Sequence, residues 1–574
     1  MEQAAIIHRP YSEYCYGLDQ NNIVLRIKVK KNDIKAVNLL IGDRMSQFEK
    51  TVSHHNMVLT ASDFTHDYFE SRINTKFERL RYYFVLTDYN NHKYIYSNFW
   101  FYEIDKDIKD YFEFHFNHIA DFFLTPQWVK SAVFYQIFPD SFATDTKYLE
   151  TKKGYNDEYN PERSYRVGGT LKGVIKNLDY LKGLGITAVY LNPIFVSKSY
   201  HKYDIDDYYH IDPCLGTDED FFELVITAHK LGIKVILDGV FNHTGTDFFA
   251  FEDIFKNGQN SKYIDWYYSI KKFPVKINNP DYYTCFAYSG NMPKLNTANY
   301  EVIKYFCDVG KYWIEKYDID GWRLDVANEL NLNFWRIFRE AVKSVKNDVY
   351  LVGEIWDDGR AWMQGDMFDG LMNYRLKNAM LDFFALGNLT AKQFCERLDY
   401  LNMRYHESGL LSMYNFLDSH DCARFLDECK STTDYMLSAV FLMFYPGAAA
   451  IYYGDETGLL GKADNEAYRK PMNWRDIDID IFAHFKNIIS IRNRFENLMC
   501  AKYQAVFYKD RAFVFKRFDD LQALYIGVNQ GNDDIVFEID DIEAIAGDKI
   551  SILPSQIIMQ PKSYFIVLKK GEKL

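Results

Sequence analysis

The stretch KYDIDGWRLDVANEL, residues 316–330, decides how the rest of the chain is interpreted. Its centre has the apolar character of a buried β-strand but carries both Arg323 and Asp325. Residues two positions apart on a strand point to the same side, so the two charges share one face. Charged side chains at the end of a buried strand are typical of barrels whose strand ends form a polar site. Other strands of this kind are therefore expected nearby.

Segments with buried-strand character alternate with helix-like segments between about residues 132 and 495. Eight strands fit this region: AVFYQIFPDSF, ITAVYLNPIF, KVILDGVFNH, IDGWRLDVAN, VYLVGEIW, DGLMNY, MYNFLDSHD and AAAIYYGDE. This alternation favours an α/β fold in which a parallel sheet closes into a (β/α)8, or TIM, barrel.

The sequence on either side of the barrel region has a different hydrophobic pattern. Short alternating runs predict antiparallel β-sandwich domains over residues 1–122 and 501–574, with the barrel domain over 123–500. After the third barrel strand the rhythm breaks, which predicts a loop-rich inserted domain at about 244–298. Such an insertion would overhang the barrel mouth.

Composition limits the classes of function. The net charge of -13 argues against a nucleic-acid surface, and no apolar run is long enough to span a bilayer. The first residues show no secretion signal, so we expect a cytoplasmic protein. Most of the many Tyr and Phe side chains are expected to fill the core, although some could form sugar-stacking platforms.

Polar residues gather at the ends of four predicted strands. Each could individually be a helix cap or a salt-bridge partner, but their convergence favours a catalytic site. They are Asp238, Asn242, His243, Arg323, Asp325, Glu354, His420 and Asp421.

Two of these carboxyl groups suit acid–base chemistry. A guanidinium at Arg323 would favour the ionised form of Asp325, as a nucleophile requires, although a buried ion pair without chemistry is the alternative. Glu354 follows an apolar run, so we expect apolar walls to keep it protonated as a general acid. One ionised and one protonated carboxyl, about 5 to 5.5 Å apart, is the arrangement of retaining glycosidases.

The segments DGVFNH, GWRLDVANE, GEIW and FLDSHD resemble the four conserved segments of the α-amylase family, glycoside hydrolase family 13, in the same order. MPKLN (292–296) and VANE (326–329) resemble its neopullulanase, cyclomaltodextrinase and maltogenic amylase subgroup. The resemblance covers the whole chain. It implies a retaining hydrolase of α-1,4-glucosidic bonds in cyclodextrins and maltooligosaccharides, with pullulan and starch as further candidate substrates and with some transglycosylation.

The resemblance also implies roles for individual residues. Asp325 would be the nucleophile, Glu354 the acid and base, and Asp421 a third carboxylate that holds and distorts the sugar. The implied substrate contacts are Tyr203, His243, Arg323 and His420 at the cleavage point, and Asn328, Glu329 and Trp356 on the acceptor side. Asn242 would contact the substrate or support its neighbours through internal hydrogen bonds.

The sequence departs from this family in three places. After GEIW, Asp357 stands where these relatives usually carry histidine, which leaves the acceptor-site preference open. Thr144 and Thr170 stand where many relatives carry acidic or amide calcium ligands, so no cofactor or metal is expected to be required. On the donor side, Arg469 matches the family, but its acidic partner could be Asp464 or Asn465.

The resemblance implies a homodimer in which the N-terminal domain reaches over the partner's active site; a starch-binding role for that domain is the competing interpretation.

Two alternatives to hydrolysis also remain. One is a glucosyltransferase or isomerase with the same chemistry, and the other is a noncatalytic scaffold, which should lack a carboxylate or carry a membrane anchor.

Overall fold

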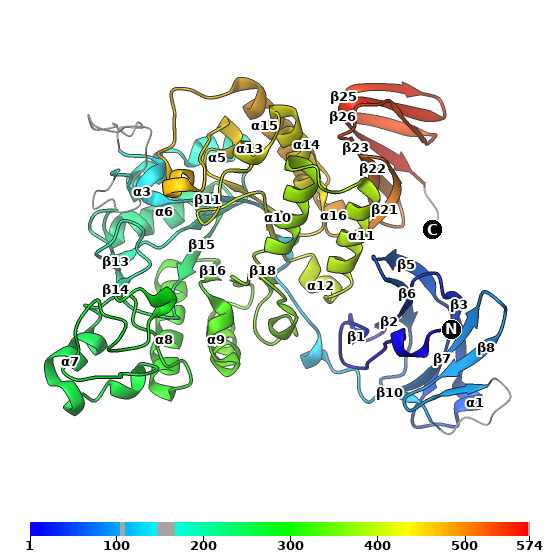
Figure 1. Cartoon of the computed structure of the whole chain (residues 1–574), viewed down its shortest axis with the longest axis horizontal. Helices are drawn as coiled ribbons and strands as arrows, with labels where there is room; N and C mark the ends of the chain where they lie inside the picture. Colours follow the sequence, from blue (N-terminus) through cyan, green and yellow to red (C-terminus); the bar gives the residue numbers. More distant parts are fainter. Residues whose placement is uncertain (104–109, 146–166, 572–574) are drawn as a thin grey trace.

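The computed structural model describes residues 1–103, 110–145 and 167–571, and Figure 1 shows the course of the chain. The N-terminal part consists of two antiparallel sheets, in the orders β1-β2-β6-β5 and β4-β3-β7-β8-β9, with β10 paired to β7. Side chains alternate between buried and partly exposed along β7, because the sheet has one face in the core. The bounds are β1 Cys15–Gly17, β2 Asn22–Lys30, β3 Ile34–Asp43, β4 Ser53–Asn56, β5 Val58–Ser62, β6 His66–Asn74, β7 Leu80–Asp88, β8 Lys93–Tyr96, β9 Phe101–Glu103 and β10 Phe112–Phe114.

A parallel sheet of eight strands forms the centre of the molecule, in the order β18-β17-β16-β15-β12-β11-β20-β19. A parallel bridge between Met372 and Tyr414 joins the two ends of this order and closes the barrel. The predicted α/β barrel with antiparallel parts on both sides is therefore confirmed. The strands are β11 Val133–Ile137, β12 Ala188–Leu191, β15 Lys234–Gly239, β16 Gly321–Leu324, β17 Tyr350–Gly353, β18 Gly370–Leu371, β19 Tyr414–Phe416 and β20 Ala448–Tyr452.

Amphipathic helices cover the outside of the barrel. Helix α6 begins with a capping box between Thr217 and Asp220, and α11 begins with another between Thr390 and Gln393. The larger helices are α6 Asp218–Lys230, α8 Tyr300–Tyr317, α9 Leu332–Val345, α10 Tyr374–Met380, α11 Ala391–Asn402, α14 Thr432–Phe444 and α15 Ile479–Arg494.

An insertion separates β15 from α8, as predicted. It contains α7 (Phe249–Asn257) and three short 3-10 turns, and it projects from the barrel at the lower left of Figure 1. Isolated bridges tie it back to the chain after β15, including one between His243 and Lys294. One side of the barrel mouth is therefore built from this insertion.

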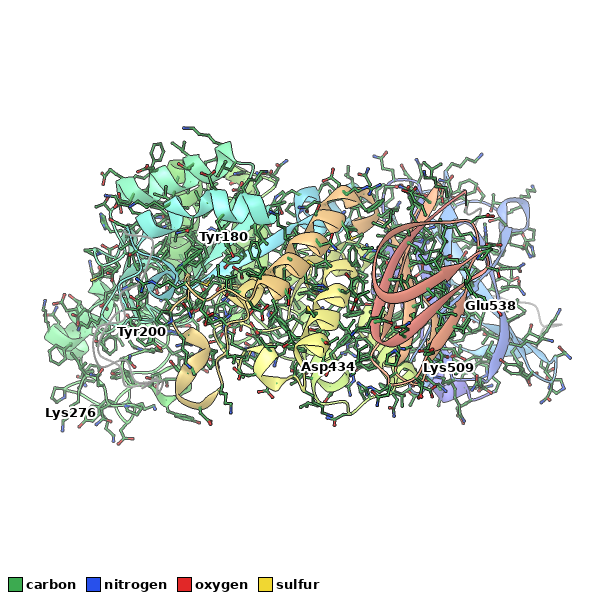
Figure 2. The ribbon with its side chains drawn as sticks, turned by 90° about the horizontal axis from the view of Figure 1, so that it is seen from above. Tyr180, Tyr200, Lys276, Asp434, Lys509 and Glu538 are labelled. Carbon is green, nitrogen blue, oxygen red and sulfur yellow. The ribbon has the colours of Figure 1, made fainter. Side chains whose placement is uncertain are left out.

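The C-terminal strands form one antiparallel sheet, in which β26 pairs with β23, β24 and β25. Figure 2 shows this sheet beside the barrel helix that carries Asp434, and the Asp434 carboxylate accepts from the ammonium of Lys562 at 2.6 Å. The strands are β21 Lys502–Lys509, β22 Ala512–Phe518, β23 Gln522–Asn529, β24 Ile535–Glu538, β25 Ile542–Leu553 and β26 Gln556–Lys570.

The N-terminal sheets are fastened to the barrel by buried polar contacts. Arg26 of β2 donates to the carbonyl of Tyr405 at 3.1 Å, and its guanidinium is also paired with Glu70 at 2.6 Å. The ring of Tyr16 stacks on His406 at a centroid distance of 4.1 Å. Within the described residues, no helix combines the length and apolar character needed to cross a membrane.

Candidate active site

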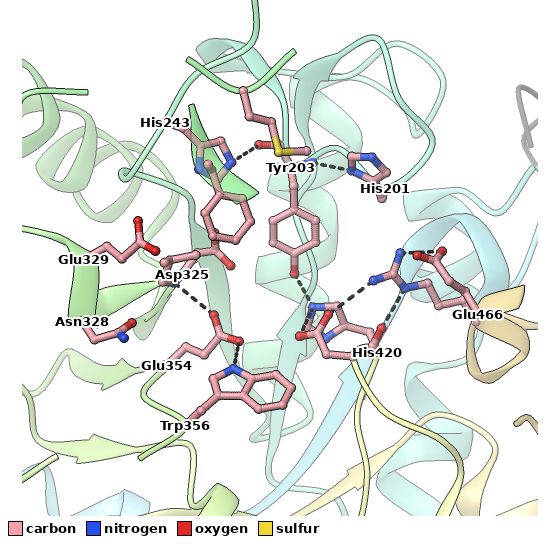
Figure 3. Close-up of a pocket in the computed structure, with 15 residues that line it drawn as sticks. His201, Tyr203, His243, Asp325, Asn328, Glu329, Glu354, Trp356, His420 and Glu466 are labelled. Atoms are coloured by element: carbon pink, nitrogen blue, oxygen red, sulfur yellow. Dashed lines mark hydrogen bonds and ion pairs between the residues drawn. The ribbon is translucent and has the colours of Figure 1, made fainter. Parts of the chain in front are cut away.

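A cavity of about 580 Å³ opens at the carboxyl ends of the barrel strands, and Figure 3 shows its lining. All three predicted catalytic carboxyl groups, Asp325, Glu354 and Asp421, line it. The predicted sugar contacts that line it are Tyr203, His243, His420 and Arg469, and also Asn328, Glu329 and Trp356. Side chains far apart in the sequence therefore converge on one space.

Arg323 lies beneath the cavity and organises its carboxyl groups. Its side chain is buried, with Nη1 at 2.7 Å from Oδ1 of Asp325 and Nη2 at 2.9 Å from Oε2 of Glu354. Nη1 also lies 3.0 Å from Asp238, because Arg323 and Asp238 are direct neighbours in the register of β15 and β16. The Asp325 and Glu354 carboxyl groups therefore share the two nitrogens of one guanidinium.

The chain turns sharply where β16 ends. Val326 has φ 45° and ψ 41°, a left-handed conformation that is rare for a β-branched residue. The turn points the backbone N–H of Val326 at Oε2 of Glu354, at 3.0 Å. The strained conformation of Val326, the residue after Asp325, thus places its N–H against the carboxyl group of Glu354.

Burial dominates the electrostatics of the cluster. It raises the pKa of Asp325 well above its usual value, with Glu354 and Asp238 adding to the shift and Arg323 opposing it. Burial likewise raises the pKa of Asp421, against the opposing charges of Arg469 and Arg323. The two guanidiniums of Arg323 and Arg469 cannot neutralise four neighbouring carboxylates, so we infer that the cluster keeps at least one proton near neutral pH.

The surroundings of Glu354 differ from the apolar walls that the sequence predicted. Besides Arg323 and the N–H of Val326, the indole N–H of Trp356 donates to Oε1 at 2.9 Å. The side chain is buried, but its oxygens face hydrogen-bond donors. The prediction was wrong because a sequence shows which residues are adjacent, not which polar atoms fold back onto them.

The two predicted histidines are neutral. Burial lowers the pKa of His243 to about 3 and that of His420 well below its usual value. The amide of Gln136 lies 2.8 Å from Nδ1 of His420, so the ring proton sits on Nε2, which faces Asp421 at 3.0 Å. Both rings can therefore donate or accept hydrogen bonds without adding positive charge.

Two predicted contacts lie behind the lining. Arg323 is one, and Asn242 is the other, fully buried with its Oδ1 bonded to Lys294 and its amide 3.2 Å from Nδ1 of His243. Lys294 also lies 3.0 Å from Glu329. Asn242 therefore supports the wall of the cavity from inside, one of the two roles left open above.

At the end of the cavity that Arg469 lines, Asp464 is exposed and does not line the cavity. Glu466 does, with its carboxylate 3.0 Å from Nη1 of Arg469 and 2.5 Å from the hydroxyl of Tyr200. Arg469 reaches Asp421 at 3.3 Å through its other terminal nitrogen. Of the two predicted partners of Arg469, Asp464 is thus not in place, and the side chain of Asn465 lies outside the described residues. Glu466, with φ 50°, turns inward from an irregular 3-10 segment.

Sequence reasoning also missed four other lining residues, His201, Phe286, Met292 and Val326. Phe286 comes from the insertion and stacks on the ring of His243 at 5.0 Å. The insertion has no periodicity that would mark inward-facing side chains. His201 lies two residues before the predicted Tyr203, Met292 belongs to the MPKLN segment and Val326 to the VANE segment, and these positions were the only available signals.

The groups around Thr170 do not fit a hard cation. The hydroxyl of Thr170 donates to Asp145 at 2.7 Å, and the ammonium of Lys176 donates to the Asp145 carbonyl. A lysine ammonium thus supplies positive charge where a calcium ion would need free oxygen ligands. Elsewhere in the described chain, no group of three or more His, Cys, Asp or Glu side chains is arranged to hold a metal ion.

Comparison with known proteins agrees with this geometry. The model of the α-amylase catalytic domain matches residues 136–525, and that of the α-amylase N-terminal immunoglobulin-like domain matches residues 1–118. A cyclomaltodextrinase of Geobacillus thermopakistaniensis is 40% identical over 93% of this chain and 92% of its own. Neopullulanase 2 of Thermoactinomyces vulgaris is 38% identical over 92% and 91%.

A solved cyclomaltodextrinase structure superposes with a TM-score of 0.91 at 34% identity, covering 99% of this chain and 100% of that one. An acid-lined cavity at the mouth of an eight-stranded barrel, together with these matches, defines an α-glucan hydrolase. The chain belongs to the α-amylase family.

Proposed function

We propose that the protein hydrolyses α-1,4-glucosidic bonds in cyclodextrins and maltooligosaccharides, and also in pullulan, with retention of the anomeric configuration. One observation carries the proposal. Asp325 and Glu354 lie on the two nitrogens of one buried guanidinium, inside a cavity large enough for a sugar. Retaining glycosidases need two carboxyl groups close enough to act on one glycosidic bond.

In the first step, an oxygen of Asp325 attacks the anomeric carbon while Glu354 gives its proton to the departing glycosidic oxygen. This forms a β-glucosyl ester and releases the leaving sugar. In the second step, Glu354 takes a proton from water, whose oxygen attacks the same carbon and frees Asp325. Attack of a sugar hydroxyl in place of water would give transglycosylation.

Further residues would hold the sugar in place. Asp421 would accept from sugar hydroxyls, supported by Arg469 at 3.3 Å and His420 at 3.0 Å. The ring of Tyr203 lies parallel to His420 at 5.5 Å and would give an apolar platform for the sugar face. Asn328, Glu329 and Trp356 would meet the acceptor sugar.

Two features of cellular context belong to the same proposal. The chain would act in the cytoplasm as a homodimer whose substrates are α-glucan oligosaccharides, without nucleic-acid or membrane partners. Light scattering coupled to gel filtration should give twice the mass of one chain. A single-chain mass at the concentration used for the assays would contradict the dimer and leave the chemistry untouched.

The test of the chemistry is product analysis on maltotriose and β-cyclodextrin, with the first anomer followed by proton NMR. Initial release of the α-anomer is expected, and the β-anomer would contradict retention. Asp325→Asn and Glu354→Gln should each lower kcat/KM on the order of 10³-fold or more. Asp308→Asn is the matched control, because Asp308 lies on the outer helix α8 paired with Lys311.

The same assay separates the alternatives. Longer or rearranged oligosaccharides as the main product would indicate a transferase or an isomerase. A folded protein that releases nothing from any α-glucan would indicate a noncatalytic scaffold.

A further inference from the structure

Every atom within 3.0 Å of the Glu354 carboxyl oxygens for which a contact is described is a hydrogen-bond donor. Oε2 faces Nη2 of Arg323 at 2.9 Å and the backbone N–H of Val326 at 3.0 Å. Oε1 faces the indole N–H of Trp356 at 2.9 Å, and the hydroxyl of Tyr374 is more distant at 3.4 Å. Figure 3 shows Trp356 directly beside Glu354.

Guanidinium, backbone and indole N–H groups can donate but cannot accept. Of the groups described around Glu354, only the Tyr374 hydroxyl, at 3.4 Å from Oε1, could accept a proton from the carboxyl group. The arrangement fits the ionised form of Glu354, whereas the first step of the proposed reaction needs the protonated form. One of these donors must give way when the leaving oxygen arrives.

The three close donors differ in their freedom to move. Arg323 is almost fully buried and also paired with Asp325, and the Val326 N–H belongs to the strained turn after β16. Trp356 is 52% exposed and lies in a loop, held by stacking on Tyr374 at a centroid distance of 4.0 Å. Only the Trp356 indole both lines the cavity and can leave Oε1 by a side-chain movement.

The other charged or titratable groups that face Glu354 come from β16 and its end, from the loop after β19 and from α10. They are Arg323, Asp325, His420, Asp421 and Tyr374. Of these groups, Tyr374 stacks on Trp356, and a Phe ring at position 356 can keep that stack. A substitution that deletes the indole N–H but keeps an aromatic ring therefore isolates one hydrogen bond.

We propose that Trp356 is a positioning residue whose indole N–H holds Glu354 in its ionised, basic form until a leaving-group sugar displaces it. This inference rests on the proposed role of Glu354. Its consequence is a bias toward the second step, in which a base is needed. The alkaline limit of the first step is then set by the indole bond as well as by the carboxyl cluster.

The test is the pH profile of kcat/KM for Trp356→Phe, measured on maltotriose and on α-maltosyl fluoride. Fluoride departs with little need for a proton, so that substrate bypasses the acid. Loss of one hydrogen bond to a charged group should move the alkaline limb for maltotriose upward by about one pH unit. The limb for the fluoride should stay where it is.

Trp362→Phe is the matched control, since its indole N–H has no hydrogen-bond partner among the described residues and it does not line the cavity. A second readout is independent of turnover. Because the deleted bond stabilises the ionised carboxylate more than the neutral carboxyl group, Trp356→Phe should lower the melting temperature more at pH 8 than at pH 5.

The outcomes separate the two proposals. The proposed role of Trp356 is overturned if Trp356→Phe leaves the alkaline limb of the maltotriose pH profile unmoved or moves it to lower pH. It is also overturned if the variant lowers the melting temperature equally at both pH values. If the wild-type profile has the same alkaline limb on both substrates, the acid role of Glu354 fails instead.

Discussion

Nη1 of Arg323 lies 2.7 Å from Oδ1 of Asp325, two residues further along the same strand end. Strand geometry places both side chains on the inner face of the barrel, and the register of β15 adds Asp238 to the same guanidinium. The site is thus assembled around a cation that is itself out of reach of the cavity. That relationship gives the first of four predictions.

Arg323→Lys should keep the positive charge but lose the fork that spans two carboxyl groups. A displacement of about 1 Å in catalytic groups can cost on the order of 100-fold, and we expect that loss in kcat/KM for maltotriose. The control is Arg336→Lys, which changes an exposed pair with Asp366 at 2.5 Å. A variant within a few-fold of wild type would show that the fork is not needed.

Glu466, rather than Asp464, should govern binding at the donor end. Glu466→Ala removes two hydrogen bonds, to Arg469 and Tyr200, and should raise KM for maltohexaose by about 3- to 10-fold. Asp464→Asn is the matched control, because that side chain is exposed and outside the cavity. If Asp464→Asn raises KM while Glu466→Ala does not, the sequence prediction of Asp464 would be right and the role of Glu466 wrong.

Chelation should not change the melting temperature. Since Lys176 lies against the Asp145 carbonyl, we expect equal thermal midpoints in EDTA and in millimolar calcium. A site occupied at 100 times its Kd would add about 2.7 kcal/mol to the free energy of unfolding and raise the midpoint by several degrees. Such a rise would contradict the absence of a calcium requirement.

Asp399 should make the fold less stable as the pH rises. It accepts the backbone N–H of Ser62 at 2.9 Å, and burial, with Asp63 and Glu396 adding and Lys31 opposing, raises its pKa to about 7. The folded state then binds more protons than the unfolded state above about pH 4, so this group costs stability progressively from pH 4 to 7.

Asp399→Asn keeps an acceptor for Ser62 but cannot ionise. Its melting temperature relative to wild type should therefore increase between pH 4 and pH 8, as followed by circular dichroism. Glu396→Gln is a useful comparison, because its carboxylate is already paired with Lys31 at 2.7 Å. A difference between Asp399→Asn and wild type that does not vary with pH would refute the shift.

The barrel and most of the cavity could be predicted because parallel strands leave continuous apolar runs, and their polar ends converge by topology alone. Glu466 could not be predicted this way. It lies in the 3-10 segment Asp464–Arg469, beyond the last barrel strand, where no period fixes which side chain points inward.

The hydrogen bonds to Glu354 were hidden for a related reason. One comes from the backbone N–H of Val326, whose left-handed conformation no residue preference would suggest. Another comes from the indole N–H of Trp356, which lies two residues after Glu354 and donates back to its carboxyl group. Sequence patterns indicate where a carboxyl group lies along the chain. Its ionisation depends on donors whose direction is set only by the folded backbone.

The bond from Arg26 to the Tyr405 carbonyl and the stack of Tyr16 on His406 have a practical consequence for protein engineering. Trimming the enzyme to a barrel that begins near residue 123 would remove these partners from the loop after α11 and leave polar and aromatic surface facing water. The N-terminal sheets hold this loop in place, and we expect a shortened enzyme to unfold locally there first.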